Sequence, residues 1–231
     1  HNDARRQRQM CIRDSPGIYA NCVEDIDLVA SVILSYDSND LDMIQNYQYK
    51  RTMSLNKPIK FGFVRGPVWN FGDEDMKNGI EEFVKNAQLD IEELDLGKDF
   101  DDAAKAHEII MNGSIANSLM NYYQTDKSNL HPFTVKRIEA GIPVSASDYV
   151  SAIEQAKKME QILKQFFKKY DAIITPAAPG QAPRDLMNTG NAIFNGYWTM
   201  MGVPAISLPF LKGKDWLLYT SPSPRDHQPS R

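Results

Sequence analysis

The chain has 231 residues, of which 42% are hydrophobic and 10% aromatic, a composition typical of a globular protein with a sizeable core. The formal net charge of −4 gives no reason to expect binding to nucleic acid or to an anionic membrane surface. No apolar run approaches the ~18 residues that a membrane-spanning helix needs, and two cysteines make no disulfide framework, which favours a reducing, cytoplasmic location.

The two ends of the chain differ in character from the rest. Residues 1–15 are polar and basic and lack the apolar segment of a signal peptide. Met10–Arg13 can be encoded by ATG TGT ATA AGA, and the reverse complement of that stretch, shifted by one base and extended, encodes Leu217–Thr220. Such inverted ends are typical of a sequencing-library adapter read as protein. We therefore expect residues 1–15 and 217–231 to be non-native and disordered, with residues 16–212 holding the fold; ordinary disordered tails are the alternative.

Helix and strand patterns alternate through the first half of the chain. Apolar spacing predicts a helix over Val23–Leu34 and a strand over Ile59–Val64. Gly72-Asp73 can cap a further helix, whose predicted core face is Met76, Ile80, Phe83, Val84 and Ala87. Leu89–Leu96 alternates as a strand with one exposed face does. The strand–helix–strand order predicts two neighbouring parallel strands.

The middle of the chain is mostly helical in pattern. A long helix is predicted over Phe100–Tyr123, weakened by Gly113, and a short one over Thr134–Gly141. Ser147 is expected to cap a second long helix over Asp148–Lys169.

The stretch from Asp171 to Pro209 changes element type four times. A short apolar run over Asp171–Thr175 predicts a buried strand. The loop that follows is kept irregular by Pro176, Pro179, Gly180 and Pro183. A helix rich in aromatic residues is predicted over Asn191–Met201, ended by Gly202–Pro204, and Ala205–Leu208 is expected to form another strand.

This stretch, DAIITPAAPGQAPRDLMNTGNAIFNGYWTMMGVPAISLP, resembles the last third of amidase signature enzymes, where it lines the acyl side of the active site. Further segments resemble the same family in the same order: Pro16–Ala20, Lys60–Arg65, Ala106–Ser118 and Ala140–Ala152. The resemblance spans roughly Pro16 to Phe210. It implies an α/β fold with a mixed sheet flanked by helices, hydrolysis of a carboxylic amide through an acyl-enzyme, and no cofactor.

The chemistry of that family lies mostly outside this sequence. In amidase signature enzymes a lysine acts as base through a bridging serine, and the nucleophilic serine sits in a Gly-Gly-Ser-(Ile/Val)-Arg setting. All three precede the segment that begins at Pro16, and this chain contains neither Gly-Gly-Ser nor a Ser-Ser pair. The resemblance therefore implies the C-terminal part of an amidase without its catalytic residues, inactive by itself. The alternative is a non-catalytic α/β binding or scaffold protein with an amidase-like fold.

Four residues near the Pro-rich loop are candidates for substrate binding. Asn191 and Asn195 lie one helical step apart, with Trp198 near the same face. An amide side chain can bond a polar substrate group, and an indole can wall an apolar pocket. Pro176 opens a rigid loop that lies beside the site in the family. Alternatively, Trp198 is core and the asparagines are helix caps. The apolar run Thr189–Pro204 favours an apolar acyl group over glutaminyl-tRNA.

Other polar residues have simpler structural interpretations. Gly113-Ser114-Ile115 imitates a nucleophile motif, but a serine within a helix usually bonds backbone or solvent. His107 is expected to be structural, and His131 has no partner at metal-ligand spacing. The acidic residues Asp99–Asp102 suit a helix N-terminus. No metal site is expected.

Overall fold

The computed structural model describes residues 17–39, 47–50, 58–183 and 190–211. The chain divides into two compact units, one of residues Ser15–Pro58 and one of His1–Asp14 with Ile59–Arg231. The predicted non-native ends, residues 1–15 and 217–231, lie outside the described residues.

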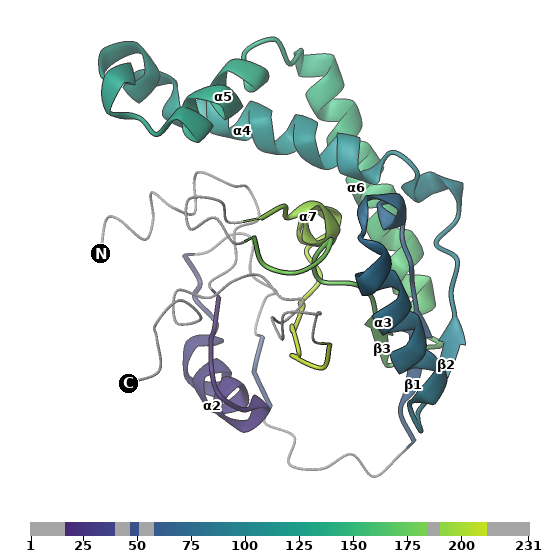
Figure 1. The fold of residues 1–231 in the computed structure, drawn as a ribbon. Coiled ribbons are helices and arrows are strands. Elements are labelled where there is room, and N and C mark those ends of the chain that lie inside the picture. The colour runs from purple at the N-terminus through teal and green to yellow at the C-terminus, as the bar shows by residue number, and fades with distance from the viewer. Residues whose placement is uncertain (1–16, 40–46, 51–57, 184–189, 212–231) are drawn as a thin grey trace, which may run out of the picture. The chain divides into compact units, whose positions relative to one another are not determined.

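The smaller unit is built on one helix. Helix α2 (Val23–Ile33) matches the helix predicted over Val23–Leu34 (Figure 1). After it, Ser35 and Gln48 form an isolated antiparallel bridge. The hydroxyl of Tyr49 donates a hydrogen bond to Oδ1 of Asp27, which joins the returning chain to the helix.

The larger unit contains a parallel sheet. Its strands are β1 (Lys60–Phe63), β2 (Asp90–Glu93) and β3 (Ala172–Ile174). Their order is β2-β1-β3, and both pairs are parallel, with Phe61 opposite Ile91 and Ala172. The predicted α/β class and the parallel pairing of the first two strands are confirmed.

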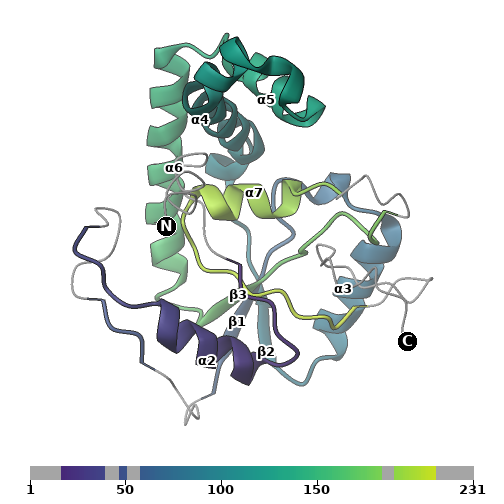
Figure 2. The same cartoon turned by 90° about the vertical axis from the view of Figure 1, so that its left-hand side faces the viewer.

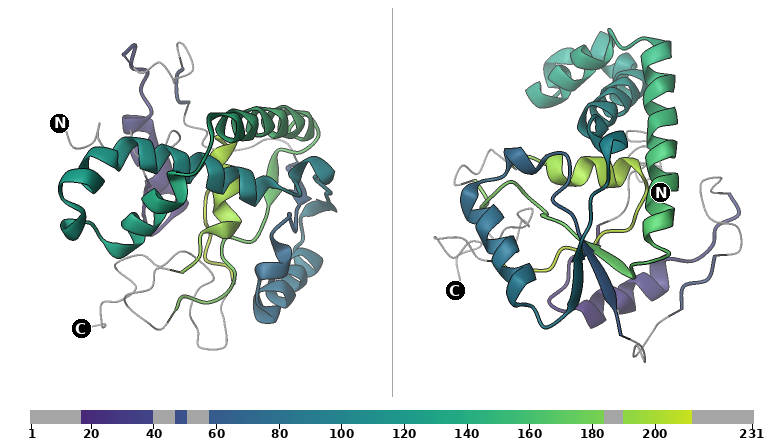
Figure 3. Two further views of the ribbon diagram at one scale, coloured as in Figure 1. Left: turned by 90° about the horizontal axis from the view of Figure 1, so that it is seen from above. Right: turned by 90° about the vertical axis from the view of Figure 1, so that its right-hand side faces the viewer.

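Helices cover both sides of this sheet. Helix α3 (Glu74–Asn86) lies on one side and helix α6 (Ala146–Phe166) on the other, as the views in Figures 2 and 3 show. Side chains from both helices enter one hydrophobic core, among them Met76, Ile80, Met159 and Leu163. Burial of Met76 and Ile80 confirms two positions of the predicted core face of α3.

The cap of α6 differs from the prediction. Oγ of Ser145 accepts a hydrogen bond from the Asp148 backbone N–H at 3.0 Å, so Ser145 is the N-cap and Ser147 already lies in the first turn. The prediction was wrong by two residues because only a side chain outside the helix can reach back to the free N–H groups of the first turn.

A second group of helices packs together beside the sheet. Helix α4 (Ala103–Thr125) contacts α5 (Pro132–Gly141) as well as α6. A Cβ built on Gly141 would lie 2.0 Å from the backbone oxygen of Asn112, so these two helices approach almost backbone to backbone. A Cβ on Gly113 would lie 3.0 Å from the ring of Tyr149 in α6. Close helix packing therefore accounts for both glycines. Short 3₁₀ helices are η1 (Trp69–Phe71), η2 (Lys98–Phe100) and η3 (Lys127–Asn129).

An ion cluster joins the three strands. Glu92 of β2 pairs with Nζ of Lys169 and Nζ of Lys60, each at 2.5 Å, and accepts a hydrogen bond from the Tyr170 hydroxyl at 3.0 Å. Hydrogen bonds from Lys169, Lys60 and Tyr170, in that order of strength, lower the pKa of Glu92 to about 2. Because Lys60 begins β1 and Tyr170 precedes β3, the cluster links all the strands.

The last described segment corrects another prediction. Helix α7 (Ile193–Met200) confirms the helix expected over Asn191–Met201, and Gly202 turns the chain with φ of +68°. Ala205–Leu208, however, is not a strand. A strand needs a hydrogen-bonded neighbour, and none of the described strands pairs with this segment, whose residues 204–210 are exposed.

Candidate functional site

The candidate site lies where β1 and β3 end against α7. Gly66 follows β1 with φ of +76°, and a Cβ built on it would lie 2.5 Å from Oη of Tyr197 in α7. Thr175 directly follows β3. In parallel α/β sheets, ligands bind outside the carboxyl ends of the strands. This edge of the sheet is thus the place to look for chemistry.

The Pro-rich loop after β3 is held from two sides. The backbone oxygen of Ala177 accepts a hydrogen bond from Nδ2 of Asn195 at 2.9 Å. The backbone oxygen of Pro179 accepts one from the backbone N–H of Asp73, which precedes α3, at 2.7 Å. Pro176 is buried. The loop is thereby fixed between α3 and α7.

The two candidate asparagines differ in what they do. Asn195 is half-buried, and because Ala177 offers an acceptor, its amide nitrogen must face the loop. Its Oδ1 receives no donor from the described residues and can accept a hydrogen bond from a ligand N–H. Asn191 is exposed, and its Oδ1 accepts from the Ile193 backbone N–H at 3.0 Å. Asn191 therefore caps the start of α7.

Trp198 is a core residue with an unusual feature. Only 6% of it is exposed, and its ring lies 4.8 Å from that of Tyr197, centroid to centroid. Its Nε1, Oη of Tyr197 and Oγ1 of Thr175 are all buried, and none has a hydrogen-bond partner among the described residues. Leaving a buried donor without a partner costs roughly 1–3 kcal/mol, so three such atoms on neighbouring residues require an explanation.

Tyr197 and Thr175 were not predicted as site residues. In the sequence, Tyr197 is one of several aromatic residues in its helix, and Thr175 is the last residue of a strand-like run. Burial raises the pKa of Tyr197 to about 12, and the nearby Thr175 and Trp198 side chains oppose this shift. The phenol is therefore neutral at physiological pH and can donate a hydrogen bond.

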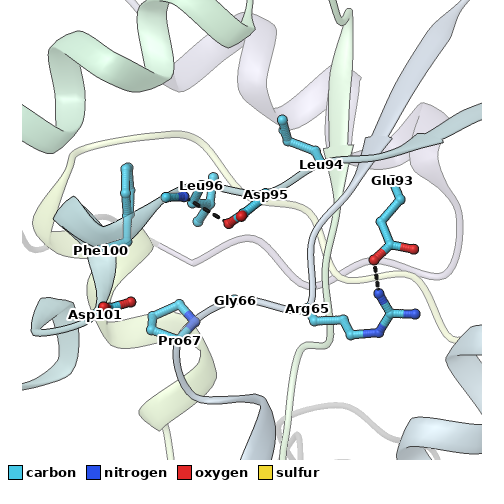
Figure 4. Close-up of a pocket in the computed structure, with 10 residues that line it drawn as sticks. Arg65, Gly66, Pro67, Glu93, Leu94, Asp95, Leu96, Phe100 and Asp101 are labelled. Atoms are coloured by element: carbon cyan, nitrogen blue, oxygen red, sulfur yellow. Dashed lines mark hydrogen bonds and ion pairs between the residues drawn. The ribbon is translucent and has the colours of Figure 1, made fainter.

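A cavity of about 390 Å³ opens at the ends of β1 and β2 (Figure 4). It is lined by Arg65, Gly66 and Pro67 after β1, by residues 93–97 at the end of β2, and by Phe100 and Asp101. None of the four predicted substrate-binding residues lines it. Gly66 connects the two features, because it lines the cavity and also lies against Tyr197.

The charges of the cavity are partly neutralised. Arg65 donates to Glu81 at 2.9 Å and also pairs with Glu93, and its guanidinium lies over the rings of Phe63 and Trp69. Arg65 is therefore fully engaged and has little freedom to bind an anion. Facing the same space, Oδ1 of Asp95 accepts the Gly97 backbone N–H at 2.9 Å.

The remaining polar candidates have structural roles, as expected. Oγ of Ser114 donates to the backbone oxygen of Ile110 at 2.6 Å, and Nδ1 of His131 accepts from the Phe133 backbone N–H at the start of α5. Burial, followed by nearby Arg137, lowers the pKa of His107.

Metal-ligating side chains do not gather in the described part of the chain. No group of three or more His, Cys, Asp or Glu side chains among these residues could hold a metal ion. None of the described helices is both long and apolar enough to span a membrane.

Comparison with known proteins decides the family. The family model described as Amidase matches residues 4–215. The chain belongs to the amidase family. This confirms the resemblance to amidase signature enzymes that the motifs carry.

Curated relatives of this amidase-family chain include subunits of tRNA-dependent amidotransferases. A glutamyl-tRNA(Gln) amidotransferase subunit of Clostridium botulinum (strain Hall) is 27% identical over 235 residues, covering 85% of this chain and 48% of that protein. The corresponding subunit from Agathobacter rectalis is 27% identical over 234 residues, covering 85% and 46%. The chain thus spans about half the length of the curated relatives it matches.

Solved structures share the fold of this amidase-family chain. 6-Aminohexanoate cyclic dimer hydrolase complexed with substrate aligns with a TM-score of 0.65 over 86% of this chain and 48% of that one, at 14% identity. A crystal structure of an amidase aligns with a TM-score of 0.60 over 70% and 41%, at 15% identity. At this level of identity the likeness concerns the fold alone.

Proposed function

We propose that this chain is the C-terminal part of an amidase signature hydrolase that cleaves a carboxylic amide C–N bond through an acyl-enzyme. The observation that supports this most is the family match over residues 4–215, in a chain that spans about half of its curated relatives. In this proposal the nucleophilic serine, the bridging serine and the lysine base belong to the part of the protein that precedes this sequence.

The described residues would serve to bind and orient the substrate. The fixed loop at Pro176 would form a rigid wall, because its backbone is pinned at Ala177 and Pro179. Oδ1 of Asn195, which faces no protein donor among the described residues, would accept the N–H of the scissile amide or of a neighbouring group. Trp198 and the apolar run around it would favour apolar acyl groups.

Recovery of the full-length gene tests the catalytic proposal. We expect a lysine, a Ser-Ser or Ser-Gly-rich block and a Gly-Gly-Ser motif in frame upstream, and hydrolysis of a simple anilide by the full-length protein with an initial burst of amine. The 231-residue chain alone should show no turnover. Turnover by this chain that persists in Ser114→Ala would contradict the proposal, whereas absence of the upstream motifs would favour a non-catalytic binding or scaffold protein.

A second experiment tests the binding roles. In the full-length enzyme, Asn195→Ala and Trp198→Phe should raise KM or alter the preference among acetyl, butyryl and octanoyl anilides. His107→Gln is the matched control, because His107 packs against Gly196 of the same helix and has no proposed contact with substrate. If Asn195→Ala and Trp198→Phe lower only the melting temperature, as the control should, both residues are scaffold.

A further inference from the structure

A buried polar cluster, formed by Thr175, Tyr197 and Trp198, remains unexplained by the proposed catalytic chemistry. Tyr197 is fully buried and Trp198 is 6% exposed, yet Oη, Nε1 and Oγ1 of Thr175 find no hydrogen-bond partner in the described part of the chain. Native proteins rarely leave such groups empty, and clustered cases usually mark an internal water or a ligand.

The chemistry of the three groups defines what they can bind. The indole Nε1 of Trp198 can only donate, while the hydroxyls of Tyr197 and Thr175 can each donate or accept. One oxygen atom with available lone pairs can therefore satisfy the whole cluster. No cationic side chain is part of it, which favours a single polar oxygen over a multiply charged anion.

The position of the cluster agrees with such a role. Thr175 ends the run of β3, and Tyr197 reaches the space beside Gly66 at the end of β1, where any Cβ would lie 2.5 Å from its hydroxyl. Gly66 also lines the cavity of about 390 Å³ at the same edge of the sheet. The cluster thus lies next to a space that a small molecule or water can enter.

We propose that Thr175, Tyr197 and Trp198 together bind one acceptor oxygen, carried either by an internal water molecule or by the carbonyl or carboxylate group of a small ligand. The bound oxygen joins the end of β3 to α7 and so holds the Pro-rich loop, which follows Thr175, in register with Asn195. This binding does not depend on amide hydrolysis and can be tested without an assay of activity.

Denaturant unfolding of the full-length protein provides the first test. Tyr197→Phe and Thr175→Val each remove one hydroxyl at nearly constant shape, and both should lower the unfolding midpoint. The double variant should lose less than the sum of the two, because both remove the same bound oxygen. Tyr149→Phe is the matched control, since it removes a hydroxyl that already has a partner in Ser114 at 3.1 Å and should show no coupling to Thr175→Val.

The opposite sign of effect would overturn the proposal. If the three atoms were simply empty, Tyr197→Phe would remove an unsatisfied group and raise the midpoint. A rise for either variant, or strictly additive losses, therefore rules out a shared oxygen.

Nuclear magnetic resonance of ¹⁵N-labelled tryptophan then identifies the source of the oxygen. The chain has three tryptophans, and Trp198→Phe assigns the Trp198 indole N–H signal. A cross-peak to water that acetate and acetamide leave unchanged indicates an internal water. A shift of the signal on adding acetate or acetamide, with a higher unfolding midpoint that Thr175→Val abolishes, indicates a ligand oxygen. A Trp198 signal with neither response overturns the proposal.

Discussion

Gly66→Ala is the substitution that most directly tests how β1 meets α7. The glycine has φ of +76°, a region that other residues enter at a cost. The new Cβ would lie 2.5 Å from Oη of Tyr197 but 3.5 Å from Cζ of the same ring and 3.7 Å from Cγ1 of Val64. The clash is therefore with one atom, the phenolic oxygen.

The two costs can be estimated separately. An alanine at positive φ costs roughly 1–2 kcal/mol. Overpacking a buried contact costs typically about 1–3 kcal/mol, and Tyr197 cannot move away easily because it is fully buried. We expect Gly66→Ala to lower the free energy of unfolding by roughly 2–5 kcal/mol, which is a fall of several degrees or more in melting temperature for a domain of this size.

Two companion variants separate these costs in chemical denaturation. Gly97 has φ of +81° and no atom within 4 Å of a built Cβ, so Gly97→Ala measures the backbone cost alone. In a Tyr197→Phe background the clashing oxygen is gone, and Gly66→Ala should then cost about as much as Gly97→Ala. The reasoning is refuted if Gly66→Ala costs no more than Gly97→Ala in the wild-type background, or costs the same with and without the Tyr197 hydroxyl.

Three further substitutions test other parts of the structure. Gly141→Ala should destabilise by at least about 1–3 kcal/mol in denaturant unfolding, because its Cβ would lie 2.0 Å from the backbone oxygen of Asn112 and the helices would have to separate; an unchanged midpoint would contradict that close approach. Glu92→Gln should flatten the acid limb of the stability profile. The pKa of Glu92 falls from 4.5 to about 2 on folding, chiefly through Lys169, so its contribution is present above pH 4.5 and lost as the pH falls to about 2; parallel acid limbs for the two proteins would argue against the cluster. Asn195→Ala should cost about 0.5–1.5 kcal/mol and speed proteolysis within the Pro-rich loop, and unaltered cleavage would show that the loop holds without it.

The local patterns in the sequence predicted most of the elements. Apolar periodicity located α2, α3, α7 and the three strands, because the spacing of side chains on a helix or strand follows from backbone geometry alone. The motif order indicated the amidase family, which the match over residues 4–215 confirms. The cap of α6 was misplaced because Ser145 and Ser147 are chemically alike, and only the backbone path decides which one lies outside the helix.

What the sequence by itself determined is the family, the α/β class and the position of the Pro-rich loop, since each depends on neighbouring residues. Tertiary structure alone decided which polar groups meet. Gly66, Thr175 and Tyr197 come from three separate elements, and no spacing in the sequence announces their contact. The same reason explains why Ala205–Leu208 could be predicted as a strand from its composition and yet is not one: strand pairing is a contact between distant segments, and its hydrogen-bond partners must be supplied by another part of the fold.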